Sequence, residues 1–292
     1  MAELRRIGPF VTHYAGQLAV GGEGVVTARR HRKRLQPLPR SPELPRPRRR
    51  ASRLWQPARI GWWVAISFSI GSSCFLVGGA LSSVAAGWFS VRPQTLNLTF
   101  AFGAVFFTLA AWGQFLEAVN APPSPELYGE TDEPRRWRWL RWRPHMIGWW
   151  ASAVQLVGTL SFNLMTLDAL LPGLLGLRAD LLTWTPNQVG SLCFLIASQF
   201  ALIEVCHRIF CLNWRELTWW IGAINMGGSI AFQLSAFFAW YRPHASASVG
   251  PWWDGAWTFV GACCFLVGAL LLLPELAEEE STPAMDEARA GP

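Results

Sequence analysis

The sequence predicts an all-α integral membrane protein whose six transmembrane helices form three tandem helical hairpins. Three observations support this fold class. The chain is 51% hydrophobic with only 15% charged residues, whereas an average soluble domain has about a quarter charged residues. Six apolar segments each approach the ~20 residues that a helix needs to cross a bilayer. One short motif also recurs in every segment, which indicates a duplicated unit.

The chain divides into an arm, a membrane domain and a tail. Residues 1–58 hold 13 of the 25 Lys and Arg residues and show no helical or strand period, so we expect a basic, largely disordered arm. Residues 59–276 are the predicted membrane domain, and residues 277–292 form an acidic tail. The run after Arg5 and Arg6 is too polar for the core of a signal peptide, so the first membrane helix is expected to direct insertion.

The apolar segments are expected to be helices, because backbone groups in lipid must be hydrogen-bonded within their own segment. The predicted hairpins span residues 60–119, 147–206 and 217–275. The segments themselves are Ile60–Ala86, Thr95–Val119, Ile147–Leu171, Val189–Cys206, Leu217–Trp240 and Ala256–Leu273.

Charge placement predicts the orientation and the partners. With a cytoplasmic N-terminus, 22 of the 25 Lys and Arg residues lie inside, so both termini are expected in the cytoplasm. The excess of Arg over Lys favours a bacterial source, and thus a bacterial plasma (inner) membrane. The arm and the loop segment 135–143, in which Arg alternates with Trp, are expected to contact anionic lipid headgroups of the bilayer rather than nucleic acid.

The recurring motif is Gly-(Ser/Thr/Ala)-x-x-Phe, present once in each segment. Gly and Phe four residues apart lie one turn apart on the same helix face. A small residue lets two helix backbones approach in lipid, so the motif predicts a packing seam of a glycine gap beside a ring. The expected helix-packing residues are Gly71, Gly103, Gly158, Gly190, Gly228, Gly261, Phe75, Phe107, Phe162, Phe194, Phe232 and Phe265.

The stretches Gly-Ser-Leu-Cys-Phe-Leu (190–195) and Gly-Ala-Cys-Cys-Phe-Leu-Val-Gly (261–268), together with their repetition, resemble the bacterial YrhK-like membrane domain. That domain is a two-helix module of uncharacterised function. The resemblance covers roughly residues 60–275 and implies three tandem copies. It implies no activity and no catalytic residue.

Three glutamates are the strongest functional candidates, because the repeat places them equivalently. Glu117, Glu204 and Glu275 each stand 14 residues after a motif glycine. One interpretation is a ring of carboxylates around an axial cation or proton site. The other is that each lies at the interface and reaches water or an arginine such as Arg208 or Arg135. Negative charge at a helix C-terminus is unfavourable, so a compensating partner is expected.

Other polar positions predict less. The amide side chains deeper in the segments are explained by interhelical hydrogen bonds as well as by a polar pathway. Asp168 has no counterpart in the repeat. Cys206, His207 and Cys211 do not match a zinc-binding spacing. We expect no metal site, no cofactor and no enzyme activity, because no nucleophile, phosphate-loop or zinc-protease motif is present. The deeper amides are Gln155, Asn163, Gln199, Asn225 and Gln233.

Two functions remain open. The first is a non-enzymatic scaffold, partner or sensor in the membrane, with a membrane protein or a second copy of the chain as its partner. The alternative is a small transporter or channel for a cation, a proton or a small solute, with the three glutamates at its inner mouth. They differ in one respect: a transporter needs a polar path open to water, whereas the Gly and Phe seams of a scaffold can seal its centre.

Overall fold

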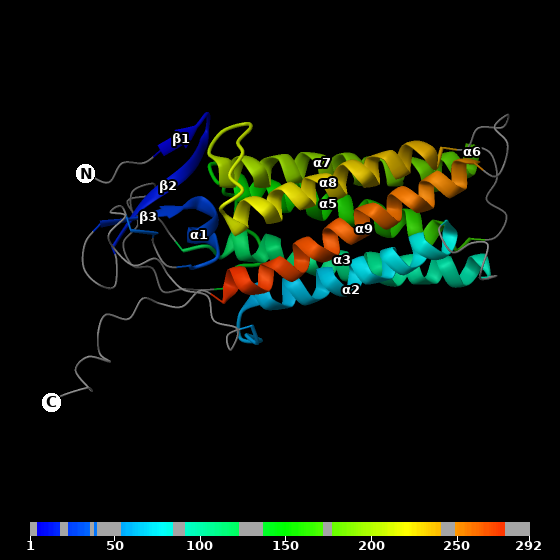
Figure 1. Cartoon of the computed structure of the whole chain (residues 1–292), viewed down its shortest axis with the longest axis horizontal. Coiled ribbons are helices and arrows are strands. Elements are labelled where there is room, and N and C mark those ends of the chain that lie inside the picture. Colours follow the sequence, from blue (N-terminus) through cyan, green and yellow to red (C-terminus); the bar gives the residue numbers. More distant parts are fainter. Residues whose placement is uncertain are drawn as a thin grey trace.

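The computed structural model describes residues 5–17, 23–35, 38–39, 54–83, 91–122, 137–171, 177–240 and 249–277. Long helices run side by side along the long axis of the molecule, and a small sheet lies at one end (Figure 1). We call that end the arm end and the opposite one the far end. The long helices are α2 (Ile60–Ser82), α3 (Pro93–Val119), α5 (Ile147–Asp168), α7 (Thr185–Cys206), α8 (Leu217–Phe238) and α9 (Val249–Leu276).

Five of these helices are long and apolar enough to cross a membrane, which supports a multi-helix membrane protein. In the fourth of the six, the apolar span begins at Leu181 and takes in the π-helix η2 (Asp180–Trp184) that follows the short α6 (Leu177–Ala179). The remaining helix, α5, has 22 residues but does not reach the same mean hydropathy. Its interior carries Gln155 and Asn163 among several hydroxyl residues, and these lower the average.

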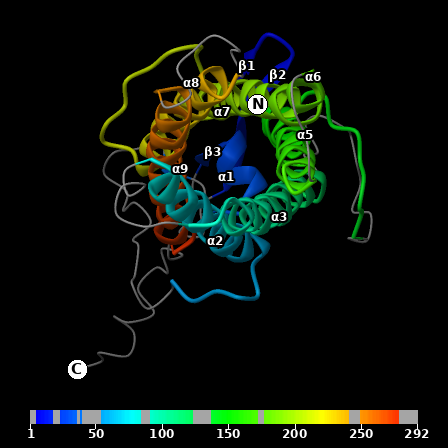
Figure 2. The ribbon, with the colours of Figure 1, turned by 90° about the vertical axis from the view of Figure 1, so that its right-hand side faces the viewer.

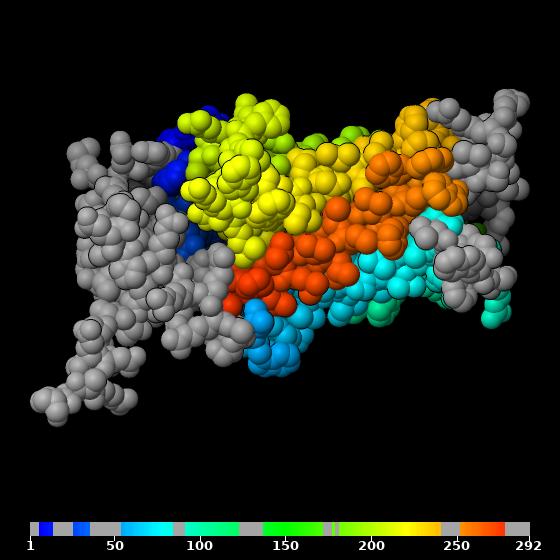
Figure 3. Space-filling model, in the orientation of Figure 1, coloured from blue at the N-terminus to red at the C-terminus, as the bar shows by residue number. Residues whose placement is uncertain are grey.

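The long helices form a closed ring. Each packs against the next one along the chain, and α9 packs against α2 to complete the circle. Figure 2 looks along the axis of this ring. Figure 3 shows one flank, on which α9 lies between α8 and α2.

Three helices begin at the residue the sequence predicts, namely Ile60, Ile147 and Leu217. The tryptophan pair in the first turn of each bonds back to the incoming chain, so it fixes the helix start in addition to any role at the headgroups. The first Trp donates its indole N–H to the carbonyl eight residues earlier, and the second to the carbonyl six residues earlier. These donor–acceptor pairs are Trp62–Leu54, Trp63–Pro57, Trp149–Arg141, Trp150–Pro144, Trp219–Cys211 and Trp220–Trp214, at 2.8–3.1 Å.

The arm differs from the expectation of disorder. It forms β1 (Arg5–Ile7), β2 (Phe10–Gln17), β3 (Glu23–Thr27) and β4 (Leu38–Pro39), an antiparallel sheet in the order β1-β2-β3-β4. Between β3 and β4 lies the helix α1 (Ala28–Arg32), and the side chain of Thr27 caps its N-terminus. The expectation is therefore wrong for these residues. Residues 40–53 of the arm and residues 278–292 of the acidic tail lie outside the described residues.

The arm is ordered by contacts with the ring rather than by local pattern. The Val11 backbone N–H donates to the His145 carbonyl, at 3.0 Å, just before α5. The rings of His13 and His207 lie 3.9 Å apart, and His207 follows the last residue of α7. On that same side a Cys206–Cys211 disulfide closes the turn between α7 and α8. The sequence analysis treated Cys206 and Cys211 as a poor match to a metal site and did not predict this disulfide.

Candidate functional site

The motif glycines lie where paired helices come closest. A Cβ built on Gly71 in α2 would lie 2.9 Å from the Gly103 carbonyl oxygen in α3, so the two backbones are almost in contact. The cysteines of the motif pack on the glycines of the neighbouring helix, with Cys74 against Gly103. The corresponding pairs in the other two hairpins are Gly158–Gly190 with Cys193, and Gly228–Gly261 with Cys264.

These close approaches bring the six motif phenylalanines together in the core of the ring. They form two stacked triangles, which we call the phenylalanine layer. Within each hairpin the two ring centroids are 5.1 Å apart. One triangle consists of Phe75, Phe162 and Phe232 at 5.8–6.4 Å, and the other of Phe107, Phe194 and Phe265 at 5.5–6.4 Å.

The three candidate glutamates meet at the arm end, where basic residues of the arm pair with them. We call Arg29, Arg32, Lys33 and these glutamates the ion-pair cluster; all six side chains are at most 8% exposed. The carboxylates come from α3, α7 and α9, and the cations from α1 and the residue after it. Seen along the ring axis, α1 lies behind the centre of the ring (Figure 2).

Arg32 joins two glutamates from different helices. Its Nη1 donates to Glu117 Oε2 at 2.9 Å, and its Nη2 donates to Glu204 Oε2 at 3.0 Å. Arg29 holds the third carboxylate, Glu275, through two bonds of 2.6 and 2.8 Å, and Lys33 Nζ lies 3.4 Å from the same group. Three positive charges therefore balance three negative charges on the axis.

The paired arginines keep their charge in this buried place. Burial by itself lowers the pKa of Arg29, but the Glu275 carboxylate and its hydrogen bond raise the pKa above its usual value. The pKa of Arg32 is raised for the same reason, with Glu204 and Glu117 outweighing burial. Such fork-shaped pairing is the geometry that suits guanidinium and carboxylate groups.

Glycines in the first turns of two helices leave room for the carboxylates. A Cβ on Gly61 would lie 3.2 Å from Glu117 Oε1, and one on Gly148 would collide with Glu204 Oε1. Both glycines directly precede a tryptophan pair, whereas the third helix has Thr218 there. Neither glycine belongs to the recurring motif, so the sequence analysis did not single them out.

A small cavity separates the cluster from the phenylalanine layer. This arm-end cavity, of about 60 Å³, reaches Arg32 and Glu204 on one side and Phe265 on the other. At about 30 Å³ per water it has room for one or two water molecules. Its polar walls include two amides singled out from the sequence, Gln155 and Asn225. A third cavity, of about 450 Å³, reaches Glu117 and Arg32 from the side of the α2 start.

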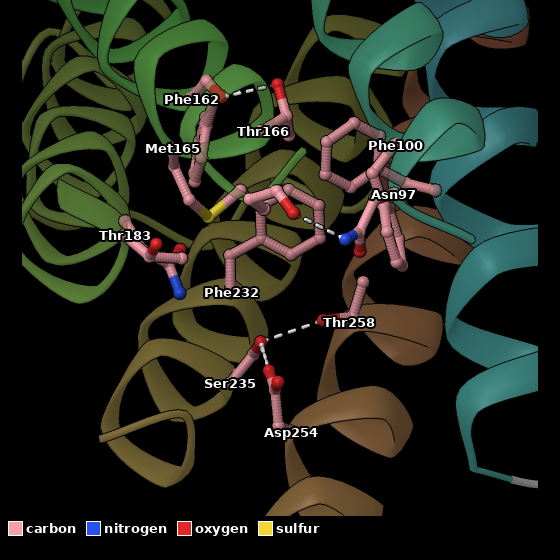
Figure 4. Close-up of a pocket in the computed structure, with 13 residues that line it drawn as sticks. Asn97, Phe100, Phe162, Met165, Thr166, Thr183, Phe232, Ser235, Asp254 and Thr258 are labelled. Atoms are coloured by element: carbon pink, nitrogen blue, oxygen red, sulfur yellow. Dashed lines mark hydrogen bonds between the residues drawn. The ribbon is translucent and has the colours of Figure 1, made fainter. Parts of the chain in front are cut away.

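Another cavity lies beyond the phenylalanine layer. This far-end cavity, of about 180 Å³, has the first triangle of rings as one wall and polar groups around it (Figure 4). Asp254 accepts a 2.6 Å bond from Ser235, whose hydroxyl is also 2.8 Å from that of Thr258. The Asn97 amide donates to the Ala169 carbonyl at 2.7 Å. Sequence reasoning did not find Asp254, because the sixth apolar segment was predicted to begin only at Ala256, whereas α9 begins at Val249.

The other polar candidates have local roles. The Asn163 amide donates to Thr108, and the Gln199 amide donates to the Ile209 carbonyl. Gln233 Oε1 is buried, and no described residue bonds to it. Asp168 ends α5 and does not line the far-end cavity. In the loop segment, residues 135–136 lie outside the described residues, and Trp137, Trp139 and Trp142 are exposed.

No protein-family model, curated protein or solved structure matches this chain. The YrhK-like resemblance therefore stays a prediction. The geometry of the site is a ring of helices with a charge-balanced cluster at one end, a layer of aromatic rings in the middle and a polar cavity beyond it.

Proposed function

We propose that the chain is a six-span membrane protein that passes a cation along the ring axis and that its own arm holds this path closed. The observation that carries the proposal is the ion-pair cluster. Three carboxylates, one each from α3, α7 and α9, converge on the ring axis. The positive charges that neutralise them come from a separate segment, α1, at the arm end.

The sixth span is α5. Its mean hydropathy is lowered by residues that face inward, whereas its exposed face is apolar. Val157, Leu160, Leu164 and Leu167 are each about half exposed and follow the three- and four-residue spacing of one helix face. That outer face suits lipid, as do the exposed Phe102, Val105 and Leu109 of α3. With the positive-inside rule, we place the arm end in the cytoplasm of a bacterial cell.

The pairing of charges favours a path over a purely structural role. A buried ion pair contributes little stability compared with well-packed apolar side chains, and the ring core is already filled by phenylalanine. Charges brought by a separable segment can instead be withdrawn. If α1 leaves, three carboxylates line the mouth of the ring and attract cations, as acidic rings do in cation channels.

The phenylalanine layer is the second barrier of the proposed path. It separates the two axial cavities with apolar rings, and a narrow apolar constriction excludes water and ions until it widens. A cation that leaves the far-end cavity would have to pass both triangles before it meets the glutamates. In this proposal the arrangement described here is the closed state of the path.

Flux measurements on the full chain in liposomes test the proposal. Uptake of rubidium and of radiolabelled methylammonium would be compared for the native protein, Arg29→Ala/Arg32→Ala, and the control Arg178→Ala, an exposed residue at the far end. We expect uptake to rise in the double variant and to stay at the native level in the control. Adding Glu117→Gln, Glu204→Gln and Glu275→Gln to the double variant should remove the gain.

The sealed scaffold is the second candidate, favoured by one observation: the phenylalanine layer fills the centre of the ring. A scaffold predicts no uptake of either cation, even when proteolysis confirms that the arm of the double variant has been released. That outcome would reject the path and leave the arm as a docking segment of a membrane scaffold.

A further inference from the structure

We propose that the far-end cavity is a binding site for a small organic cation of the alkylammonium class. The ion's charge would meet the carboxylate of Asp254, and its alkyl groups would meet the phenylalanine rings (Figure 4). This inference deepens the proposed function, because it names the class of cation that enters the path at its far end.

The first argument is an unbalanced charge. Each glutamate at the arm end has a cationic partner, but among the described residues no Lys, Arg or His side chain pairs with Asp254. The described residue that bonds to it is Ser235, a neutral donor. A carboxylate inside a ring of membrane helices is costly without a countercharge. Asp254 is also beyond the first turn of α9, where a helix start favours negative charge most.

The second argument is the aromatic lining. Phe75, Phe162 and Phe232 form the floor of the cavity, and Phe100 forms part of its side. The face of an aromatic ring attracts a cation, and this interaction is strongest where water is excluded. Several rings beside one carboxylate are the combination that recognises ammonium groups carrying alkyl substituents.

The third argument is against a metal ion. Calcium takes six to eight oxygen ligands, and magnesium demands a tight octahedron, whereas this cavity offers a single carboxylate, and aromatic rings form one of its walls. Among the described residues there is no group of three or more His, Cys, Asp or Glu side chains that would hold a metal. The volume of about 180 Å³ equals several waters at about 30 Å³ each, which suits a molecule of several non-hydrogen atoms.

Calorimetric titration of the full chain in lipid nanodiscs tests the site. Tetramethylammonium and ethylammonium are the probes, ethanol is the neutral analogue of the second, and potassium is the inorganic cation. We expect saturable binding of the two ammonium ions only. Asp254→Asn should weaken it at least about tenfold, since a charged contact is lost, and Phe100→Leu about threefold. The matched control Asp168→Asn, a carboxylate outside the cavity, should bind like the native protein.

Labelling of the native protein keeps the test valid if Asp254→Asn does not fold. A carbodiimide that modifies Asp254, followed by mass spectrometry, should react more slowly when tetramethylammonium is present. The inference is overturned if neither ammonium ion binds, if binding survives Asp254→Asn, or if potassium binds at this aspartate as well as they do. Binding without flux would reject the path but keep the site. Flux without binding would keep the path but reject the site.

Discussion

Removal of Arg32 is the sharpest test of how the arm is held. This guanidinium joins Glu117 and Glu204, and all three side chains are almost fully buried. Arg32→Ala leaves two carboxylates buried without their partner. Breaking a single buried pair in this way costs about 3–5 kcal/mol. At 1.36 kcal/mol per factor of ten, a loss of about 3 kcal/mol lowers the ratio of docked to undocked arm by about 150-fold.

Limited proteolysis in detergent, with a protease of broad specificity, measures this ratio through the rate of cleavage in the arm. The matched control is Arg34→Ala, because Arg34 donates to the Asn120 carbonyl in an exposed setting, and such a contact is worth about 1 kcal/mol or less. Glu117→Gln and Glu204→Gln in the Arg32→Ala background should restore much of the protection. Equal cleavage of the Arg32 and Arg34 variants, or no restoration, would refute the reasoning.

Two further predictions concern pH and packing. His31 in α1 has its pKa lowered from 6.5 to about 4 by burial and by Arg143; the undocked arm therefore takes up a proton first as the pH falls. The free energy of arm docking should be at its full value above pH 6.5 and weaker by about 2 kcal/mol at pH 5. His31→Gln should remove this pH-dependent weakening. Fluorescence transfer between the arm and the ring measures the docking. Gly71→Ala should lower the free energy of unfolding by about 1–3 kcal/mol, because its Cβ would press on the Gly103 carbonyl. The control Gly227→Ala, which has open space around it, should leave the free energy of unfolding unchanged. Equal melting temperatures of the two variants would contradict the packing argument.

The helical part of the fold was accessible from the sequence because its determinants are local and repeated. Apolar length predicts the long helices, and three of the apolar segments begin at the same residue as their helices, namely Ile60, Ile147 and Leu217. Helix ends at the far end were less predictable. The structure starts α9 at Val249 rather than Ala256, since Trp252, Trp253 and Asp254 are helical although the apolar run begins later.

The partner of the glutamates was the part that sequence reasoning missed. A compensating cation was expected, but nearby loop residues such as Arg208 and Arg135 were considered, whereas the pairs formed are with Arg29 and Arg32. These lie 246 and 172 residues from their carboxylates. A run of basic residues ordinarily indicates a solvated tail, and nothing local separates that case from a segment ordered by distant charges.

The cluster and the phenylalanine layer together argue for a device that opens. A ring that only had to be stable would be closed by the aromatic layer alone, because apolar packing contributes as much as a buried ion pair and avoids its desolvation cost. This chain has both, and it places the charges on a segment that reaches the ring only from the N-terminal arm. The free energy that holds such a segment is set by ionic contacts that pH and charge substitution can change. In the proposed path, the phenylalanine layer determines what can cross, and the arm determines when.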